Sequence, residues 1–167
     1  MSITFRHSAG FGKRIEYWVA GLMLKQGIDV YMPLIDDNGI DAVIRRPDGT
    51  FVEIQIKARS RDVKFGDAAL FAALTHEIRE NYYFVFYSER LETFWIMTSK
   101  EFVEHSAQNK SGKNIGKRSI WFNGKRKNRE TGEYTEHCHE LLSNFISRQT
   151  VNEQLQRINL RCALIAR

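Results

Sequence analysis

The segment NGIDAVIRRPDGTFVEIQIKAR, residues 38–59, carries polar groups that can do chemistry on an otherwise apolar pair of strands. Glu53, Gln55 and Lys57 occupy alternate positions, so a β-strand would place them on one face. The valine and isoleucines between them would then face the core. The run PDGT predicts a hairpin turn, and the strand before it brings Asp41 beside the Gln55–Lys57 end. We therefore expect an acid, an amide oxygen and a lysine in one patch.

The pairing register decides how close these groups come. Pairing across PDGT puts residue 41 opposite 56 or 57, depending on whether the turn carries a bulge. Glu53 lies about two residues nearer the turn, which is ~7 Å along the strand. Such a face can simply be exposed to solvent, as on most alternating strands. The runs 82–89 and 93–98 are strongly apolar, however, so the sheet should be largely covered, and a lysine there needs a partner.

The elements that position this patch follow from periodicity and turn residues. Helices are predicted over 12–26, with Gly27 as the stop, and over 66–81. Strands are predicted over 29–34, 40–46, 51–57, 82–89, 93–98 and 118–122. A short helix capped by Ser99 should follow residue 98, and a last helix should cover 150–166. This order indicates an α/β domain with a mixed sheet, in which the helix over 66–81 forms the crossover.

On these residues the chain resembles the PD-(D/E)XK nuclease superfamily, the restriction-endonuclease-like fold shared with Holliday-junction resolvases and some homing endonucleases. The superfamily core has the order α-β-β-β-α-β, which residues 12–88 reproduce. The resemblance implies that Asp41 is the motif aspartate and Lys57 the motif lysine. It also implies that Glu16 is the glutamate that several branches carry on the first helix. Gln55 stands at the position of the second acid, which is the one departure.

The resemblance implies a catalytic set of Glu16, Asp41, Gln55 and Lys57. Asp41, the Gln55 side-chain oxygen, the Ile56 backbone carbonyl and Glu16 would hold the metal, which should be Mg²⁺ or Mn²⁺ because every ligand is oxygen. Lys57 would orient or help to deprotonate the attacking water. The chain would then be a metal-dependent endonuclease that hydrolyses DNA phosphodiester bonds. Since glutamine supplies less negative charge, the alternative is a catalytically inactive nucleic-acid-binding module on the same fold.

The positive charge of the chain is concentrated in one segment. The net charge is +5, and residues 105–129 contain eight Lys and Arg and no acid, whereas the rest of the chain is acidic. Such a block with polar spacers is typical of a contact to a phosphate backbone, although it can also be an ordinary solvated loop. The predicted DNA-binding residues are Lys110, Lys113, Lys117, Arg118, Lys125, Arg126, Lys127 and Arg129, with Lys13 and Arg14 of the GFGKR run as a second group.

Length and composition set the remaining expectations. The 167 residues, 43% of them apolar, suffice for one domain over 1–167, with a core at 12–104, a basic extension at 105–129 and a C-terminal part at 130–167. Two cysteines without a paired spacing favour a reducing compartment, and no apolar run is long enough to span a bilayer. We therefore expect a cytoplasmic protein without a membrane anchor. Cleavage of both strands of double-stranded DNA needs two sites, which predicts a homo-oligomer, a dimer or higher.

Overall fold

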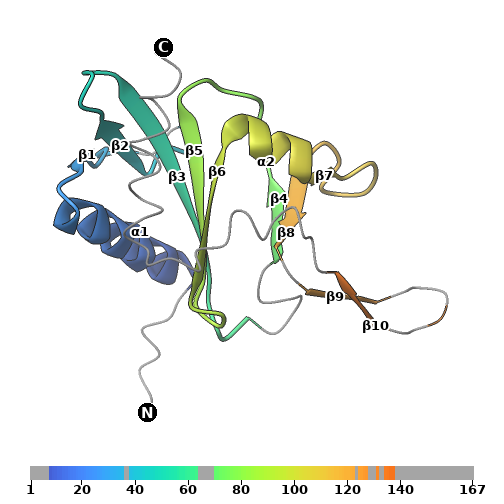
Figure 1. Ribbon diagram of the computed structural model, residues 1–167. Helices are drawn as coiled ribbons and strands as arrows, with labels where there is room; N and C mark the ends of the chain where they lie inside the picture. Colours follow the sequence, from blue (N-terminus) through green and yellow to red (C-terminus); the bar gives the residue numbers. More distant parts are fainter. Residues whose placement is uncertain are drawn as a thin grey trace.

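The computed structural model describes residues 8–35, 38–63, 70–122, 124–127, 131 and 134–137. Two helices and ten strands are defined in this part of the chain (Figure 1). In chain order they are α1 (Ser8–Lys25), β1 (Asp29–Tyr31), β2 (Ala42–Arg45), β3 (Phe51–Arg59), β4 (Leu70–Leu74), β5 (Tyr82–Ser88), β6 (Thr93–Thr98), α2 (Ser99–His105), β7 (Ala107–Gln108), β8 (Arg118–Trp121), β9 (Gly124–Lys127) and β10 (Tyr134–His137). Neither described helix is long and apolar enough to cross a membrane.

The main sheet has five strands in the order β1-β2-β3-β5-β6. β3 and β5 run parallel, while the pairs β1–β2, β2–β3 and β5–β6 are antiparallel. The fold is therefore mixed α/β, as the sequence predicts. β3 lies in the centre, so the residues of the predicted patch that it carries are on a strand paired with β2 on one side and β5 on the other.

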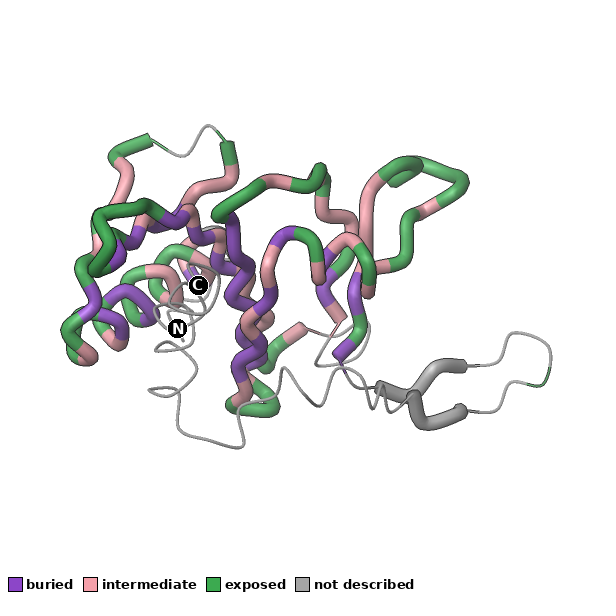
Figure 2. The backbone as a smooth tube through the Cα atoms, turned by 45° about the horizontal axis from the view of Figure 1, so that its top comes forward, coloured by how far each residue is buried: buried purple, intermediate pink, exposed green. Residues whose placement is uncertain are grey.

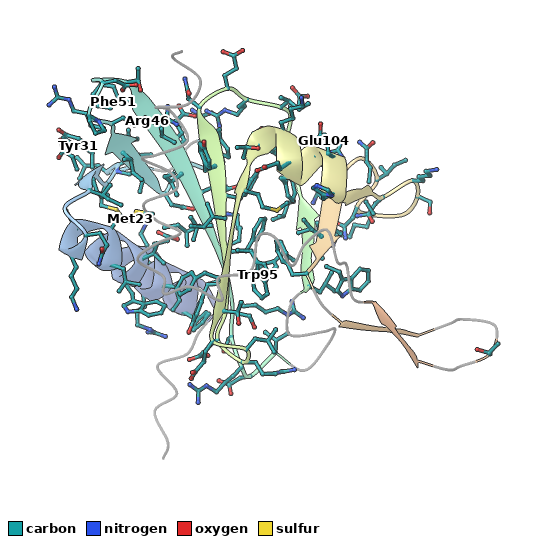
Figure 3. The ribbon with its side chains drawn as sticks, in the orientation of Figure 1. Met23, Tyr31, Arg46, Phe51, Trp95 and Glu104 are labelled. Atoms are coloured by element: carbon teal, nitrogen blue, oxygen red, sulfur yellow. The ribbon has the colours of Figure 1, made fainter. Side chains whose placement is uncertain are left out.

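Helix α1 covers one face of this sheet, as Figure 1 shows. Its predicted apolar positions point inward, with Val19 and Met23 buried against Ile54 and Val85 of the central strands. Figure 3 shows Met23 between α1 and the sheet. Removing these side chains from water stabilises the contact by roughly 1.5–3 kcal/mol for each large apolar residue. The helix is thus held by its buried stripe.

The opposite face is covered by a small sheet of order β4-β8-β7 and by α2. Between the two sheets lies an aromatic core. Trp95 of β6 stacks on Phe122 with ring centroids 4.6 Å apart, and Phe84 of β5 contacts Phe102 of α2 at 4.4 Å. Figure 2 shows buried residues along the central strands and exposed residues in the connecting turns. Both faces of the main sheet are therefore covered, which explains why β5 is buried along its whole length.

The helix predicted over 66–81 is wrong. Residues 70–74 form strand β4, which pairs antiparallel with β8, and residues 75–79 have no regular structure. Residues 64–69 lie outside the described part of the chain. The run has good helix formers, but Phe71 is buried in the aromatic core and packs on Phe86 at 4.8 Å. Tertiary packing and pairing with β8 therefore override a weak local propensity.

Several boundaries of the predicted elements also change. The strand predicted over 29–34 ends at Tyr31, and the hairpin strands are Ala42–Arg45 and Phe51–Arg59. The N-cap of α2 is Thr98 rather than Ser99. The Thr98 side chain accepts the Glu101 backbone N–H, and the Glu101 side chain accepts the Thr98 backbone N–H, which makes a complete capping box.

The hairpin register differs from the expected one because of the turn. Arg46 N–H donates to the Thr50 carbonyl at 2.8 Å, which leaves a three-residue loop with Gly49 at φ +83. Ala42 therefore pairs with Ile54, and residue 41 does not lie opposite 56 or 57 in the backbone ladder.

Part of the basic extension forms two further strands. β9 and β10 pair antiparallel into a ribbon, with Lys125, Arg126 and Lys127 on β9. Figure 1 shows this ribbon standing away from the main sheet on the β8 side. Arg129 and the helix predicted over 150–166 lie outside the described residues.

Candidate active site

Asp41 is a buried acid at the start of β2. Only 3% of the residue is exposed, and its Oδ2 accepts a hydrogen bond from the Ile56 backbone N–H at 2.7 Å. The Asp41 backbone N–H donates to the Ile54 carbonyl at 2.8 Å, although the partner of Ile54 in the ladder is Ala42. Two successive residues thus face one, which is the geometry of a β-bulge. The bulge turns the Asp41 side chain along the edge of β3, so that it takes the place of the next strand residue.

The Ile56 backbone carbonyl points to the same side of β3 as the Ile56 N–H. In an antiparallel ladder the N–H and C=O of one residue point to the same neighbouring strand. Since the Ile56 N–H points to Asp41, the Ile56 carbonyl points beyond the end of β2, where no strand of the described residues continues the ladder. The Ile56 carbonyl and the Asp41 carboxylate are therefore on the same side of β3.

Gln55 and Lys57 flank Ile56 on β3. Their neighbours across the parallel pair are Phe84 and Phe86, so both side chains lie on the face opposite α1. Both are partly buried. The Gln55 amide lies against Gly39, because a Cβ built at Gly39 would collide with the amide nitrogen and come within 3.2 Å of the amide carbon. The structure records no hydrogen bond or ion pair between Lys57 and another described residue.

Glu16 approaches from the other side, on α1. Its carboxylate is 15% exposed and accepts a hydrogen bond from Lys13 Nζ at 2.6 Å. This hydrogen bond raises the pKa of Lys13, and the charge of Asp41 raises it further. The Lys13 ammonium is thus under the influence of both acids, Glu16 and Asp41. No contact joins Glu16 directly to Gln55 or Lys57 within the described residues.

Glu53, the remaining polar residue of the face, is already paired. Its carboxylate forms an ion pair with Arg79, which lies in the segment between β4 and β5. Arg79 also donates to the Asn38 carbonyl at 3.1 Å, and Tyr82 Oη donates to the Gly39 carbonyl at 2.6 Å. Arg79 and Tyr82 were not among the predicted site residues, because residues 66–81 were predicted to form a helix and Tyr82 to begin a buried strand. Their signal in the sequence is their place at the start of β5, the strand next to β3, and just before it.

The donor set fits a hard cation. Two carboxylates, one amide oxygen and one backbone carbonyl are the oxygen ligands that Mg²⁺ and Mn²⁺ prefer. Among the described residues no group of three or more His, Cys, Asp or Glu side chains is gathered for a metal. The ion pair with Glu16 and the charge of Asp41 both favour the positive charge of Lys13.

The predicted DNA-binding residues lie at several places. Arg14 is exposed on α1, Lys110 and Lys113 are exposed in the loop after β7, and Lys117 is half-buried. Arg118 Nη1 donates to the Val103 carbonyl at 3.1 Å, so this guanidinium caps the end of α2. Lys125, Arg126 and Lys127 follow one another along β9.

The chain is similar in structure to a bacterial homing endonuclease, I-Ssp6803I. The superposition covers 94% of this chain and 98% of that chain, with a TM-score of 0.55 and 18% sequence identity. No protein-family model matches the chain, and no curated protein matches it. The likeness is one of fold.

Proposed function

We propose that the chain is a metal-dependent endonuclease of the PD-(D/E)XK type that hydrolyses DNA phosphodiester bonds. One observation carries the proposal: the buried Asp41 carboxylate is hydrogen-bonded to the backbone of Ile56, the residue between Gln55 and Lys57. This hydrogen bond joins two residues that are 15 positions apart in the chain. The fold shared with a bacterial homing endonuclease supports a nuclease that acts on DNA.

Asp41, Gln55, the Ile56 carbonyl and Glu16 would hold Mg²⁺ or Mn²⁺. When bound there, such an ion polarises the scissile phosphate and acidifies a coordinated water. The Asp41 carboxylate is kept in place by the Ile56 N–H, so it needs little reorganisation to act as a ligand.

Lys57 is the general acid–base and electrostatic residue of this proposal. Its side chain is partly buried and has no described hydrogen-bond partner that would compete with a substrate. The ammonium can donate to the attacking water or to a phosphate oxygen, and it offsets the charge that develops on the phosphorus oxygens.

Plasmid nicking in Mg²⁺ or Mn²⁺ tests the proposal. We expect the wild type to nick supercoiled DNA and Lys57→Ala to lower the rate by at least about 100-fold, since one general acid–base residue contributes that much. Lys25→Ala is the matched control, because Lys25 is exposed at the end of α1, away from β3. Equal nicking by both variants, or no nicking by the wild type in either metal, would contradict the proposal.

The second candidate is a catalytically inactive DNA-binding module, and Gln55 is the observation that favours it. A neutral amide in place of a carboxylate gives the ion one anionic ligand less. Tight binding of duplex DNA without cleavage under any divalent metal would establish this module instead.

A further inference from the structure

The segment 38–41, which delivers Asp41 to the edge of β3, is held by two side chains that are not part of the motif. Tyr82 Oη donates to the Gly39 carbonyl at 2.6 Å, and Arg79 Nη1 donates to the Asn38 carbonyl at 3.1 Å. The carbonyls of Asn38 and Gly39, which precede Asp41 by three and two residues, are thus both fixed. Both donors come from the far side of the parallel pair, since Tyr82 is the first residue of β5.

Arg79 is itself fixed on three sides. Its guanidinium forms an ion pair with Glu53 on β3 and lies 4.4 Å from the centre of the Tyr82 ring. Its backbone N–H donates to Ser99 Oγ at 2.8 Å, and Ser99 is 1% exposed. His76 Nε2 is hydrogen-bonded to the same hydroxyl at 2.7 Å. An arginine fork with both ends fixed can hold a carbonyl in one position.

The position of Gly39 matters to Gln55 as well as to Asp41. Gly39 has φ +68 and lies close to the Gln55 side chain. A Cβ added at Gly39 would collide with the Gln55 amide nitrogen. A shift of segment 38–41 would therefore move the two proposed metal ligands together.

We propose that Arg79 and Tyr82 are positioning residues that hold segment 38–41, so that Asp41 and Gln55 present their oxygens to one metal ion. Glu53 orients Arg79 and is not a ligand, because its carboxylate is taken by the guanidinium. The inference rests on the proposed function, since it names the residues that support the same site.

Tyr82→Phe is the sharpest test, because it removes one hydroxyl and keeps the buried ring. Tyr87→Phe is the matched control: it makes the same change on the same strand, where the ring packs on Trp18 and Phe94. Calorimetric titration with Mn²⁺ should show about tenfold weaker binding for Tyr82→Phe and no change for Tyr87→Phe, as for other supports of metal ligands. The Asp41 backbone N–H, which donates to the Ile54 carbonyl, should exchange its hydrogen faster in Tyr82→Phe but not in Tyr87→Phe.

Arg79→Lys provides a second variant that keeps the charge. A lysine can pair with Glu53 but cannot also reach the Asn38 carbonyl with a second nitrogen. We therefore expect weaker Mn²⁺ binding and faster exchange of the Asp41 amide hydrogen in this variant too. In cleavage, both variants should lower kcat by about 10- to 100-fold and leave the KM for DNA within about twofold, because the basic residues are untouched.

Unchanged Mn²⁺ affinity and unchanged Asp41 exchange in Tyr82→Phe and Arg79→Lys would overturn the inference. Equal losses of Mn²⁺ affinity and of Asp41 protection in Tyr82→Phe, Arg79→Lys and the control Tyr87→Phe, as a uniform loss of stability would produce, would also overturn it. If the wild type neither binds Mn²⁺ nor cleaves DNA, the proposed function fails. The exchange rate of the Asp41 amide then still decides whether Arg79 and Tyr82 hold this segment.

Discussion

At Gln55 the site offers a neutral amide oxygen where the resembled motif has a carboxylate. The amide lies against Gly39 and is partly buried, so its orientation is constrained by the backbone of a neighbouring segment. A carboxylate of almost the same shape fits the same space. The identity of this one residue therefore sets the charge of the ligand set without changing its geometry.

We predict that Gln55→Glu binds Mg²⁺ more tightly than the wild type, by roughly tenfold or about 1.4 kcal/mol, because it adds an anionic oxygen ligand. Titration calorimetry measures this affinity. Gln26→Glu is the control, since it makes the same change just after α1. Weaker Mg²⁺ binding in Gln55→Glu would contradict the assignment of Gln55 as a ligand.

In the proposed site, Lys13 would compete with the metal for Glu16. Its ammonium is 2.6 Å from the Glu16 carboxylate, and the side chain is 51% exposed. An ion pair of this kind stabilises by only about 0.5–1 kcal/mol. We therefore expect Lys13→Met to strengthen Mn²⁺ binding by roughly two- to fivefold in the absence of DNA. Lys25→Met on the same helix should leave the affinity unchanged, and an equal effect of both changes would show that Lys13 acts only through net charge.

At the scale of elements, the connection between β3 and β5 has a second role besides closing the parallel pair. Its last part, residues 75–81, packs His76 against the rings of Tyr82, Phe84 and Phe102. Burial, together with the smaller effect of the nearby charges of Arg79 and Arg118, lowers the pKa of His76 from 6.5 to about 4. The packed form of the histidine is thus the neutral one.

This gives a pH dependence of stability with a definite sign. Between pH 6.5 and 4 the unfolded chain binds a proton at His76 that the folded chain does not. The contribution is therefore fully present above pH 6.5 and is lost as the pH falls toward 4. Because the ring is partly exposed, we expect only about 1 kcal/mol. Urea unfolding at pH 8 and pH 5 should show this loss in the wild type, and His76→Gln should lack it. The same pH dependence in both proteins would refute the assignment.

For the whole molecule, the proposed binding to DNA would depend on residues away from the site. The site carries two acids, whereas the excess positive charge lies in residues 105–129. Part of it, Lys125, Arg126 and Lys127, sits on the ribbon of β9 and β10. A two-stranded ribbon has the dimensions of the major groove. The proposed enzyme thus separates the residues that hold DNA from those that cut it.

Replacing Lys125, Arg126 and Lys127 by alanine should weaken binding to all duplex sequences alike. The slope of log K against log salt should flatten by up to about three units, since each phosphate contact contributes roughly 0.9. A control replaces three exposed cations on other elements: Lys25, Arg45 and Lys100. Fluorescence anisotropy at several salt concentrations measures both proteins. If the ribbon variant binds DNA with unchanged affinity and slope, the ribbon is a solvated element that does not contact DNA. The DNA contact would then be sought at Lys13 and Arg14.

If the chain cleaves both strands of duplex DNA, we expect it to be a homo-oligomer. One site acts on one strand, and a two-fold dimer matches the symmetry of the duplex. Light scattering should therefore give at least twice the mass of the 19.5 kDa chain. A monomeric mass together with double-strand breaks would contradict this expectation.

The sequence by itself determined the local elements around the site. The alternation of Val52, Ile54 and Ile56 with polar residues predicted β3, and the helical spacing of Val19 and Met23 predicted α1. PDGT predicted the hairpin. These patterns are local, because a strand or helix with one buried face repeats its apolar residues at a fixed period.

The tertiary structure decided the crossover, the register and the surroundings of Asp41. Residues 70–74 form a strand because Phe71 packs in the aromatic core and β8 supplies the pairing partner. Asp41 reaches the Ile56 N–H through a bulge that depends on the three-residue turn before Thr50. Arg79 reaches the Asn38 carbonyl across β3 and β5. Each of these contacts joins residues far apart in the chain, and their free energy exceeds the small local propensities that a sequence pattern reports.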